Sequence, residues 1–284
     1  QHVTVALSGD GGDELFGGYN RYIRGPGLWK RLSKVPKPIR QVSGHAAQVL
    51  PEKTWDMIGG AYNHLRHGSA GISGLGTKVH RLSERLRLTD NLDDLHRNMA
   101  STWIEPETVM AGNISEPPSQ LDDPLPAFGA DDPAMRMMVQ DMRSYLPDDI
   151  LCKVDRAAMG VSLETRTPFL DPDVIALSTR LPMAMKIRDG QGKWALRQVL
   201  YQHVPREMIE RPKAGFAIPI GIWLRGPLRD WAEELLSHER LAKDGFFDPD
   251  IVRQTWAEHL SGRRDWTARL WAILMFQAWH AQNE

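Results

Sequence analysis

The chain has 284 residues, of which 42% are hydrophobic and 25% are charged. This composition is typical of a globular protein and excludes a disordered, collagen-like or disulfide-rich miniprotein class. The 35 basic and 36 acidic residues almost cancel, so the net charge of −1 does not indicate a nucleic-acid-binding surface. The length fits one large domain or two small ones.

The single cysteine and the hydropathy pattern indicate where such a protein works. Cys152 has no partner for an internal disulfide, which favours a reducing compartment. No stretch approaches the ~18 uninterrupted apolar residues of a membrane helix, and no signal-peptide pattern opens the chain. We therefore predict a cytoplasmic protein with no membrane partner. Because Gln1 almost directly precedes a predicted strand, we also expect the sequence to be a piece of a longer polypeptide.

The first predicted element is a short strand. Val3, Val5 and Leu7 alternate with less apolar residues, which predicts a buried strand. A glycine-rich turn at 8–12 follows, and the acidic residues that begin 13–16 favour a helix start there. A strand, a glycine loop and a helix make half of a βα unit, so the opening predicts an α/β fold.

Helix dominates the prediction after that strand. Residues 29–95 read as helices separated by loops, with a Gly/Ser-rich surface loop at 68–76. The stretch 116–133 is rich in proline and aspartate, which favours an extended connection. Residues 135–159 are expected to be helical with a break at Pro147.

The remaining elements follow the same periodicity rules. We expect a short extended piece at 161–163 and a helix at 193–201. The tail 266–279 predicts an amphipathic helix, whose apolar stripe consists of Leu270, Ile273, Leu274, Gln277 and Ala278. Four tryptophans of the C-terminal region are predicted to anchor helix packing: Trp256, Trp266, Trp271 and Trp279. The histidines show no metal-ligand spacing, and Cys152 is expected to be a small buried hydrophobic residue.

The glycine turn carries the strongest chemical signal. Glycines between a strand and a helix expose backbone N–H groups to phosphate. Three carboxylates, those of Asp10, Asp13 and Glu14, lie in the same turn and would repel a bare phosphate. A hard cation such as Mg²⁺ resolves this conflict, because it bridges carboxylate and phosphate oxygens. The turn therefore predicts a metal–nucleotide site.

Two other interpretations of this turn stay open on its residues alone. It can be an ordinary βα turn in which Asp13 caps the helix and Glu14 favours the helix dipole. It also nearly matches one copy of the glycine–aspartate nonapeptide with which β-roll proteins bind calcium, although those proteins stack many copies.

Further blocks along the chain make the signal more specific. The turn reads SGDGGDELFGGY from Ser8 to Tyr19, and D-R-A-A-M follows at 155–159. The block S-L-E-T-R-T-P-F-L-D spans 162–171, K-x-x-L-R begins at Lys193, and R-P-K-x-G-F-x-x-P spans 211–219. In this order the blocks resemble the asparagine synthetase family, the class with a glutaminase domain. The resemblance covers most of the chain and is weak between about 28 and 133.

The resemblance implies a fold and a domain position. It implies that 1–284 is the later part of a synthetase domain, an α/β, helix-rich part of a doubly wound parallel-sheet ATP-pyrophosphatase domain of the adenine nucleotide alpha hydrolase type. The family's glutaminase domain, with its N-terminal cysteine nucleophile, and its S-G-G-x-D-S pyrophosphate loop are absent from the sequence. We therefore expect that this chain alone has no glutaminase activity and binds ATP poorly.

The resemblance also implies a reaction. In that family the aspartate side-chain carboxylate attacks the α-phosphate of ATP and forms a β-aspartyl-adenylate. Ammonia, supplied from glutamine by the glutaminase domain, then displaces AMP. The implied cofactors are ATP and Mg²⁺, the substrates are small molecules, and a homodimer is possible. Nucleic acid is not an expected partner.

Individual site residues follow from the matched positions. Asp10 and Lys213 match catalytic positions, although many relatives have the longer Glu where this chain has Asp10. Asp13 matches a Mg²⁺ ligand. The ATP-binding positions are Ser8, Gly9, Gly11, Gly12 and Lys213. Glu14, Asp155, Arg156, Glu164 and Arg166 match positions that contact the substrate or support residues that do.

Several of these residues also have a purely structural interpretation. Glu164 and Arg166 are two apart in an extended segment, so they face the same side and are expected to form an ion pair. Phe169 and Leu170 are expected in the core. Lys193 and Arg197 are predicted to be structural or to attract phosphate rather than to be catalytic.

Alternative functions remain beside the leading one. Related adenylating amide synthases include β-lactam synthetases, lasso-peptide cyclases and amidotransferases of polysaccharide gene clusters. The acidic Asp10 favours asparagine synthetase over the β-lactam type, which carries Tyr there, but does not separate it from the polysaccharide-linked group. Hypotheses of another class are a non-catalytic calcium-binding or interaction module and a degenerate family member retained as a scaffold; the intact Asp10, Asp13 and Lys213 argue against the last.

Overall fold

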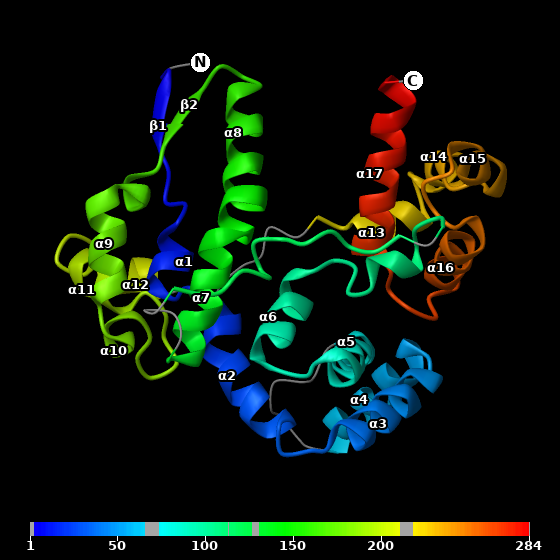
Figure 1. Cartoon of the computed structure of the whole chain (residues 1–284), viewed down its shortest axis with the longest axis horizontal. Helices are drawn as coiled ribbons and strands as arrows, with labels where there is room; N and C mark the ends of the chain where they lie inside the picture. The colour runs from blue at the N-terminus through cyan, green and yellow to red at the C-terminus, as the bar shows by residue number, and fades with distance from the viewer. Residues whose placement is uncertain (1–2, 66–73, 113, 127–130, 211–217, 284) are drawn as a thin grey trace. The chain divides into compact units, whose positions relative to one another are not determined.

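The computed structural model describes residues 3–65, 74–112, 114–126, 131–210 and 218–283. The chain divides into two compact units, each assembled from three segments (Figure 1). The first unit contains Gln1–Lys34, Asp90–Ala100 and Pro118–Ala214, and the second contains Val35–Thr89, Ser101–Pro117 and Gly215–Glu284. None of the described helices is long and apolar enough to cross a membrane. The described residues form a helix-rich α/β structure, because helices make up most of it and a small parallel sheet lies in the first unit.

The first unit carries both described strands and short helices around them. Its strands are β1 (Val5–Leu7) and β2 (Glu164–Arg166). It also has a π-helical turn, η3 (Leu146–Leu151), and a 3₁₀ turn, η4 (Pro168–Leu170). Its helices are α1 (Gly12–Phe16), α2 (Asn20–Leu32), α6 (Leu92–Ala100), α7 (Pro133–Arg143), α8 (Cys152–Met159), α9 (Pro172–Arg180), α10 (Met183–Lys186), α11 (Trp194–Leu200) and α12 (Arg206–Ile209). The predicted helix break at Pro147 is confirmed as the π-helical turn between α7 and α8.

The two strands pair in parallel, with Val5 opposite Glu164 and Leu7 opposite Arg166. The prediction of a buried first strand is wrong: Val5 is 45% exposed and Leu7 is 78% exposed. Parallel strands are normally covered on both faces by helices and by further strands. Among the described residues β1 pairs with β2 alone, so its apolar side chains stay in contact with solvent.

The core of the first unit is rich in methionine. Tyr22 of α2 and Met137 and Met138 of α7 are buried together. Further apolar side chains pack around them, among them Leu92, Met99, Met142, Met183 and Ile187. Methionine is flexible and polarizable, so it fills the irregular gaps between short helices that meet at several angles. Helix α7 begins where the sequence sets it, because Asp132 accepts hydrogen bonds from the N–H groups of Ala134 and Met135 and Pro133 occupies the first helical position.

The second unit contains helices and no strand among its described residues. They are α3 (Lys37–Val49), α4 (Glu52–Leu65), α5 (Leu75–Leu88), η1 (Pro106–Thr108), α13 (Ile220–Arg225), α14 (Arg229–Leu235), α15 (His238–Asp244), α16 (Pro249–Ser261) and α17 (Thr267–Asn283). Helix α5 starts at Leu75, so the loop predicted for 68–76 ends two residues early; its earlier part lies outside the described residues.

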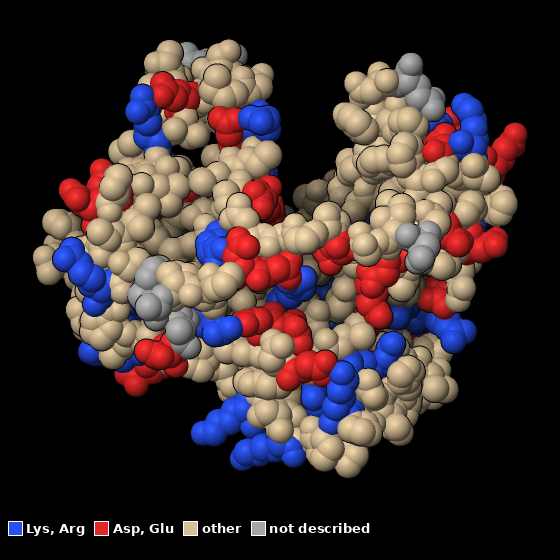
Figure 2. Space-filling view, viewed as in Figure 1, with Lys and Arg blue, Asp and Glu red and all other residues tan. Residues whose placement is uncertain are grey.

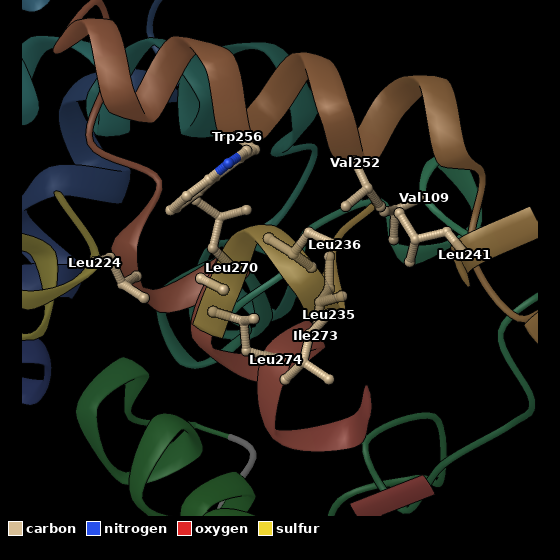
Figure 3. Close-up of a cluster of buried hydrophobic side chains, with 11 residues drawn as sticks. Val109, Leu224, Leu235, Leu236, Leu241, Val252, Trp256, Leu270, Ile273 and Leu274 are labelled. Atoms are coloured by element: carbon tan, nitrogen blue, oxygen red, sulfur yellow. The ribbon is translucent and has the colours of Figure 1, made fainter. Parts of the chain in front are cut away.

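A continuous hydrophobic core joins the C-terminal helices of this unit (Figure 3). Its central members are Leu224, Leu236, Leu241, Val252, Trp256, Leu270, Ile273 and Leu274. The predicted stripe on α17 is confirmed, since Leu270, Ile273, Leu274 and Gln277 are all buried. Trp256, Trp266 and Trp271 pack in or against this core as predicted.

Three sequence-based expectations need correction, and one is confirmed. Trp279 contacts Phe276 but is 59% exposed, so it does not anchor packing as the other tryptophans do. Cys152 is exposed rather than buried, because it lies at the first position of α8, where the chain leaves the π-helical turn. The extended piece lies at 164–166 instead of 161–163, since Ser162 adopts a left-handed backbone (φ 59°) and turns the chain before β2 begins. The expected extended connection at 116–133 is confirmed over its described part, which holds no helix or strand before α7 starts at Pro133.

Candidate active site

The glycine loop lies where the carboxyl ends of the two strands meet. The N–H of Ser8, just after β1, donates to the carbonyl oxygen of Arg166 at 2.7 Å. The Ser8 hydroxyl donates to the carboxylate of Asp10 two residues on. In open α/β sheets, ligands bind beyond the carboxyl ends of the strands. The predicted strand–glycine loop–helix arrangement is therefore confirmed, and it has the geometry of a ligand-binding turn.

The loop has a backbone that admits only glycine at its centre. Gly11 has a positive φ of 83° and precedes α1, and a Cβ there would lie 2.5 Å from Leu170 Cδ2. The backbone N–H groups of Gly9 and Gly11 have no hydrogen-bond acceptor among the described residues. Gly9 is also exposed. The exposed Gly9 N–H is therefore free to donate to an anionic ligand, whereas Gly11 is a buried residue.

The expectation that Phe169 and Leu170 lie in the core is only partly correct. Both side chains are half-buried and pack against the glycine loop. The Phe169 ring also meets the Phe16 ring edge to face, with centroids 5.9 Å apart. Phe169 and Leu170 pack against the loop because Gly11 and Gly12 have no side chains, and η4 fills the space that this leaves.

Asp13 is held by a lysine from a distant part of the sequence. Lys193 Nζ lies 2.9 Å from Asp13 Oδ2, and the two side chains are 31% and 32% exposed. Lys193 is in turn placed by its own N–H, which donates to the carbonyl of Phe16 at 2.9 Å. A Cβ on Gly18 would fall 1.8 Å from Asp13 Oδ1 and 2.4 Å from Lys193 Cε, so only glycine lets this ion pair lie against the backbone. The sequence-based expectation for Lys193 did not include a partner within the loop.

Glu14 is buried directly behind Asp13. Glu14 is only 1% exposed, and its carboxylate accepts a hydrogen bond from the Tyr19 hydroxyl at 2.8 Å. Burial raises the pKa of Glu14, and the Tyr19 hydrogen bond counteracts part of that rise. Burial also raises the pKa of Tyr19. Glu14 therefore supports the loop from inside instead of facing a ligand.

A second cluster of buried polar side chains lies near Glu14 and Tyr19 and is centred on Asp141 of α7. Asp141 accepts from Arg21 Nε at 2.7 Å and from the Tyr22 hydroxyl, and its other oxygen lies 2.9 Å from His96 Nε2. The side chains of Asp141 and His96 are fully buried. The Arg21 guanidinium also stands over the rings of Tyr19 and Tyr145, at 4.4 and 4.6 Å. The network joins α2, α6 and α7 to the residues that follow the loop.

The other predicted site residues fall into exposed pairs. Asp155 and Arg156 bond to each other at 2.5 Å on the exposed surface of α8. The ion pair expected between Glu164 and Arg166 is confirmed at 2.6 Å, with both side chains exposed. Arg197 pairs with Glu210 at 3.3 Å and donates to the carbonyl of Gly192, which indicates a structural role. The predicted catalytic and ATP-binding Lys213 lies outside the described residues.

A magnesium ion would have few protein ligands at this loop. No group of three or more His, Cys, Asp or Glu side chains converges on a common point in the described part of the chain. Mg²⁺ in nucleotide sites is bound by one or two carboxylates together with substrate phosphates. The half-exposed carboxylates of Asp10 and Asp13 fit that pattern, and in this structure Lys193 occupies the position beside Asp13 that a cation would take.

Sequence reasoning missed the residues that surround the loop. Arg21, His96 and Asp141 show no motif spacing, and their pairing follows from tertiary contacts. Lys186 of α10 is fully buried, with its ammonium 3.7 Å from Met135 Sδ, and burial lowers its pKa to about 8. The one available signal was the run of polar and aromatic residues Tyr19, Arg21 and Tyr22 directly after the glycine loop.

Acidic and basic side chains are interspersed on the surface that Figure 2 displays, in keeping with the net charge of −1.

Comparison with known proteins adds to this geometry. The sequence model of the family described as asparagine synthase matches residues 1–281. A Mycobacterium tuberculosis (strain H37Rv) protein provisionally named asparagine synthetase (glutamine-hydrolyzing) is 36% identical over 99% of this chain and 40% of its own length. Bacillus subtilis asparagine synthetase (glutamine-hydrolyzing) 1 is 29% identical over the whole chain and 41% of its own length.

A more distant relative carries a different name. The protein of Gibberella zeae named amidase chry2 is 23% identical over 87% of this chain and 37% of its own length. No solved structure matches the chain at a comparable level of significance. The chain thus spans about two fifths of the length of the curated relatives that it matches.

Proposed function

The chain belongs to the asparagine synthase family, and from this premise we propose that its glycine loop is part of the ATP site of a synthetase that converts aspartate to asparagine. The observation that carries the proposal is the loop itself: free N–H groups, Asp10 and Asp13 share one turn beyond the carboxyl ends of two parallel strands. The loop's N–H groups suit phosphate, and its carboxylates suit a phosphate-bound cation.

The proposed reaction forms an amide in two steps. An aspartate side-chain oxygen attacks the α-phosphorus of ATP, the bond to the bridging oxygen breaks, and pyrophosphate leaves. Ammonia then attacks the acyl carbon of the β-aspartyl-adenylate, and AMP leaves with the oxygen that came from aspartate. A carboxylate does not acylate ammonia unaided, because oxide is a poor leaving group, and adenylation removes that obstacle.

Each loop residue has a role in this scheme. The N–H groups of Gly9 and Gly11 donate to phosphate oxygens, and Ser8 and Gly12 shape the turn around them. Asp10, oriented by the Ser8 hydroxyl, faces the reacting end of the nucleotide. Lys193 is the cation nearest to Asp13 and is placed to neutralise charge that develops on pyrophosphate. When bound, Mg²⁺ would supply further neutralisation of the same charge, with Asp13 as its protein ligand.

We assign two further roles from the resemblance alone. Lys213 would contact the phosphates and stabilise the charged intermediate. Asp155, Arg156, Glu164 and Arg166 would line or support the acceptor side. In the structure these four residues form exposed ion pairs with each other, so this role requires them to meet groups outside their present pairs.

The exposed strand β1 supports a proposal about the fold. We propose that β1 and β2 are neighbouring strands of a larger doubly wound parallel sheet of the ATP-pyrophosphatase type. The exposure of Val3, Val5 and Leu7 supports it, because such side chains are normally covered in a parallel sheet. On this proposal the pyrophosphate loop and the glutaminase domain belong to the part of the relatives' length that this chain does not match. These 284 residues alone would then neither hydrolyse glutamine nor bind Mg-ATP tightly.

An isotope-labelling experiment tests the proposed adenylate mechanism. Full-length protein is incubated with Mg-ATP, glutamine and aspartate whose side-chain carboxylate carries oxygen-18, and AMP is analysed by mass spectrometry. Transfer of one labelled oxygen to AMP is expected. Label in inorganic phosphate instead, or ADP as the product, would overturn the adenylate mechanism.

A pair of variants links the reaction to the loop. Asp13→Asn removes the proposed metal ligand and the partner of Lys193, so aspartate-dependent pyrophosphate release should fall by about 10³-fold. Glutamate production from glutamine should persist in the same variant and in Lys213→Ala. The matched control is Asp148→Asn, since Asp148 is exposed on η3. Equal loss of both activities in Asp13→Asn would contradict the assignment.

A second acceptor chemistry has one observation in its favour. The similarity to the protein named amidase chry2 shows that relatives of this chain carry other amide-related names. The alternative is an adenylating amide synthase with another carboxylate acceptor, such as the polysaccharide-linked, β-lactam or lasso-peptide types. A panel of carboxylic acids assayed for AMP release decides between them, and aspartate should be the best substrate.

A further inference from the structure

The second unit contains a cavity of about 300 Å³ that the proposed reaction does not use. Its walls come from α5, from the segment around η1, from α16 and from the start of α17. Its volume is at the lower end of the range of small-molecule sites, roughly 300–1,000 Å³. None of its lining residues belongs to the glycine loop or to the first unit.

Two arginines in the wall share a single carboxylate. Glu84 Oε1 accepts from Arg264 Nη2, and Glu84 Oε2 lies 3.0 Å from Arg269 Nη2. All three side chains are largely buried, at 14–17% exposure. Two guanidinium groups against one carboxylate leave one positive charge without a partner in this cluster. Burial lowers the pKa of Arg269, and the charge of Arg264 adds to this, whereas Glu84 and, more weakly, Glu105 raise it.

The arginines are also held in place by aromatic rings. Arg264 stands 3.9 Å from the centre of the Trp266 ring, and Arg269 stands 4.8 Å from the same ring and 5.0 Å from that of Trp103. The two indoles are nearly parallel, at 18°. Arg269 Nε donates in addition to the carbonyl of Thr102 at 3.0 Å. A guanidinium fixed in this way loses little entropy when it binds a ligand.

Both arginines keep donors for a ligand. Arg264 Nε and Nη1 and Arg269 Nη1 have no protein acceptor among the described residues. These three nitrogens are also not among the buried side-chain atoms that lack a partner, so each is accessible to solvent. Adjacent guanidinium donors suit the two oxygens of a carboxylate.

The cavity also presents negative charge. Glu105 lines it half-buried; its charge acts on Arg269 through space, but in the described part of the chain its carboxylate makes no direct hydrogen bond or ion pair. Glu258 lines it as well and accepts a hydrogen bond from Trp266 Nε1 at 2.8 Å. With Arg87, the wall holds three arginines and three glutamates. A simple anion would satisfy the arginines but would bring a second negative charge close to Glu105.

We propose that this cavity binds a free α-amino acid, with its carboxylate on Arg264 and Arg269 and its ammonium group on Glu105. A zwitterion is the small ligand that can contact the free guanidinium donors and the Glu105 carboxylate at once, and so bridge charges that do not touch each other. The apolar parts of Ile104 and Ile251 line the remaining wall and would contact its side chain. The site is independent of the proposed synthetase chemistry, since it uses none of its residues.

Calorimetric titration of the full-length protein tests the proposal. The probes are L-valine, 3-methylbutanoate, which lacks the amino group, and 2-methylpropylamine, which lacks the carboxylate; L-alanine and L-methionine extend the side-chain range. None of these is aspartate or glutamine, so the proposed substrates do not interfere. At least one amino acid should bind ten times or more tightly than its acid and amine analogues. Equal binding of the acid would mean a simple anion site and would overturn the proposal, as would the absence of binding by every amino acid.

Variants place the ligand in this cavity. Glu105→Gln should weaken amino-acid binding at least tenfold, because it removes the partner of the ammonium group while no protein contact is lost. Glu107→Gln, two residues along and exposed, is the matched control and should bind as the unaltered protein does. Arg269→Lys should weaken binding of the amino acid and of the acid analogue alike, and its circular dichroism confirms that it is folded. If Glu105→Gln and Glu107→Gln bind equally well, the ligand does not occupy this site.

Discussion

The two units of this chain are stabilised by different kinds of interior. The centre of the first unit holds ionisable and polar side chains, Asp141, Arg21, His96 and Glu14, beside a small methionine-rich core. The centre of the second holds leucines and tryptophans between amphipathic helices, and its charged groups surround a cavity. Buried ion pairs contribute little net stability but fix the positions of neighbouring groups, whereas apolar packing contributes stability directly. The difference indicates that the first unit is organised around a loop that must be held in one position.

The largest expected effect is on the buried network of the first unit. Asp141→Asn removes the charge that compensates Arg21, so the free energy of unfolding should fall by about 3–5 kcal/mol. Chemical denaturation followed by circular dichroism measures this. Asp148→Asn, at an exposed position, is the control and should change stability by no more than about 0.5 kcal/mol. A loss below about 1 kcal/mol in Asp141→Asn would show that the network is not what holds the first unit together.

A core truncation tests the second unit in the same assay. Leu274 is fully buried in the hydrophobic cluster of α17, and Leu274→Ala should cost about 3 kcal/mol through lost burial and the cavity left behind. Met275, the next residue, is 39% exposed, and Met275→Ala should cost less than about 1 kcal/mol. If Leu274→Ala and Met275→Ala lowered the stability equally, the apolar core would not be what stabilises the second unit.

Acid should destabilise the second unit through one histidine. His259 is fully buried between Trp256, Arg225 and Asp265, and burial, followed by the charge of Arg225, lowers its pKa to about 4. The unfolded chain therefore binds more protons than the folded one between about pH 6.5 and about pH 4. Stability is fully present above that window and is lost as pH falls through it, by at most about 3 kcal/mol.

The variant His259→Gln should remove this part of the pH dependence. Unfolding is measured at several pH values from 7 to 4. His238→Gln, whose imidazole is 63% exposed, should keep the slope of the unaltered protein. A slope that persists in His259→Gln would mean that other groups carry the acid sensitivity.

The smallest expected effect concerns the hydrogen bond behind the glycine loop. Tyr19→Phe leaves the buried Glu14 carboxylate without its hydroxyl donor and should cost about 1–2 kcal/mol at neutral pH. Because the pKa of Glu14 is already raised by burial, its contribution is favourable at low pH and is lost as pH rises through the folded pKa. The cost of Tyr19→Phe should therefore be smaller in acid. The exposed pair Tyr201 and Glu210 is the control, and Tyr201→Phe should change stability by less than about 0.5 kcal/mol.

Local signals in the sequence were sufficient for several elements. The stripe on α17, the helix break at Pro147 and the strand–glycine loop–helix order of the candidate site all depend on neighbours within a few residues. The same is true of the ion pair of Glu164 and Arg166. Such features are predictable because periodicity, capping and backbone freedom act over one or two turns.

Exposure and long-range pairing were not predictable in the same way. The strand at Val5 and Leu7 has the composition of a buried strand, but burial depends on which other elements cover it. Cys152 has an apolar preference, yet its position after the π-helical turn exposes it. These errors have a common origin, since a residue's preference says nothing about the partner that must arrive from elsewhere in the chain.

By itself the sequence determined the chemistry of the candidate site: glycines that free backbone N–H groups, and carboxylates that suit a phosphate-bound cation, all within one short turn. Only the tertiary structure decided which groups surround that turn. It brought Lys193 to Asp13 across 180 residues, assembled the Asp141 network from three helices, and placed Glu84 between Arg264 and Arg269 in the second unit. The physical reason is that charge compensation acts through space at a few ångströms, whereas the sequence orders residues along the chain.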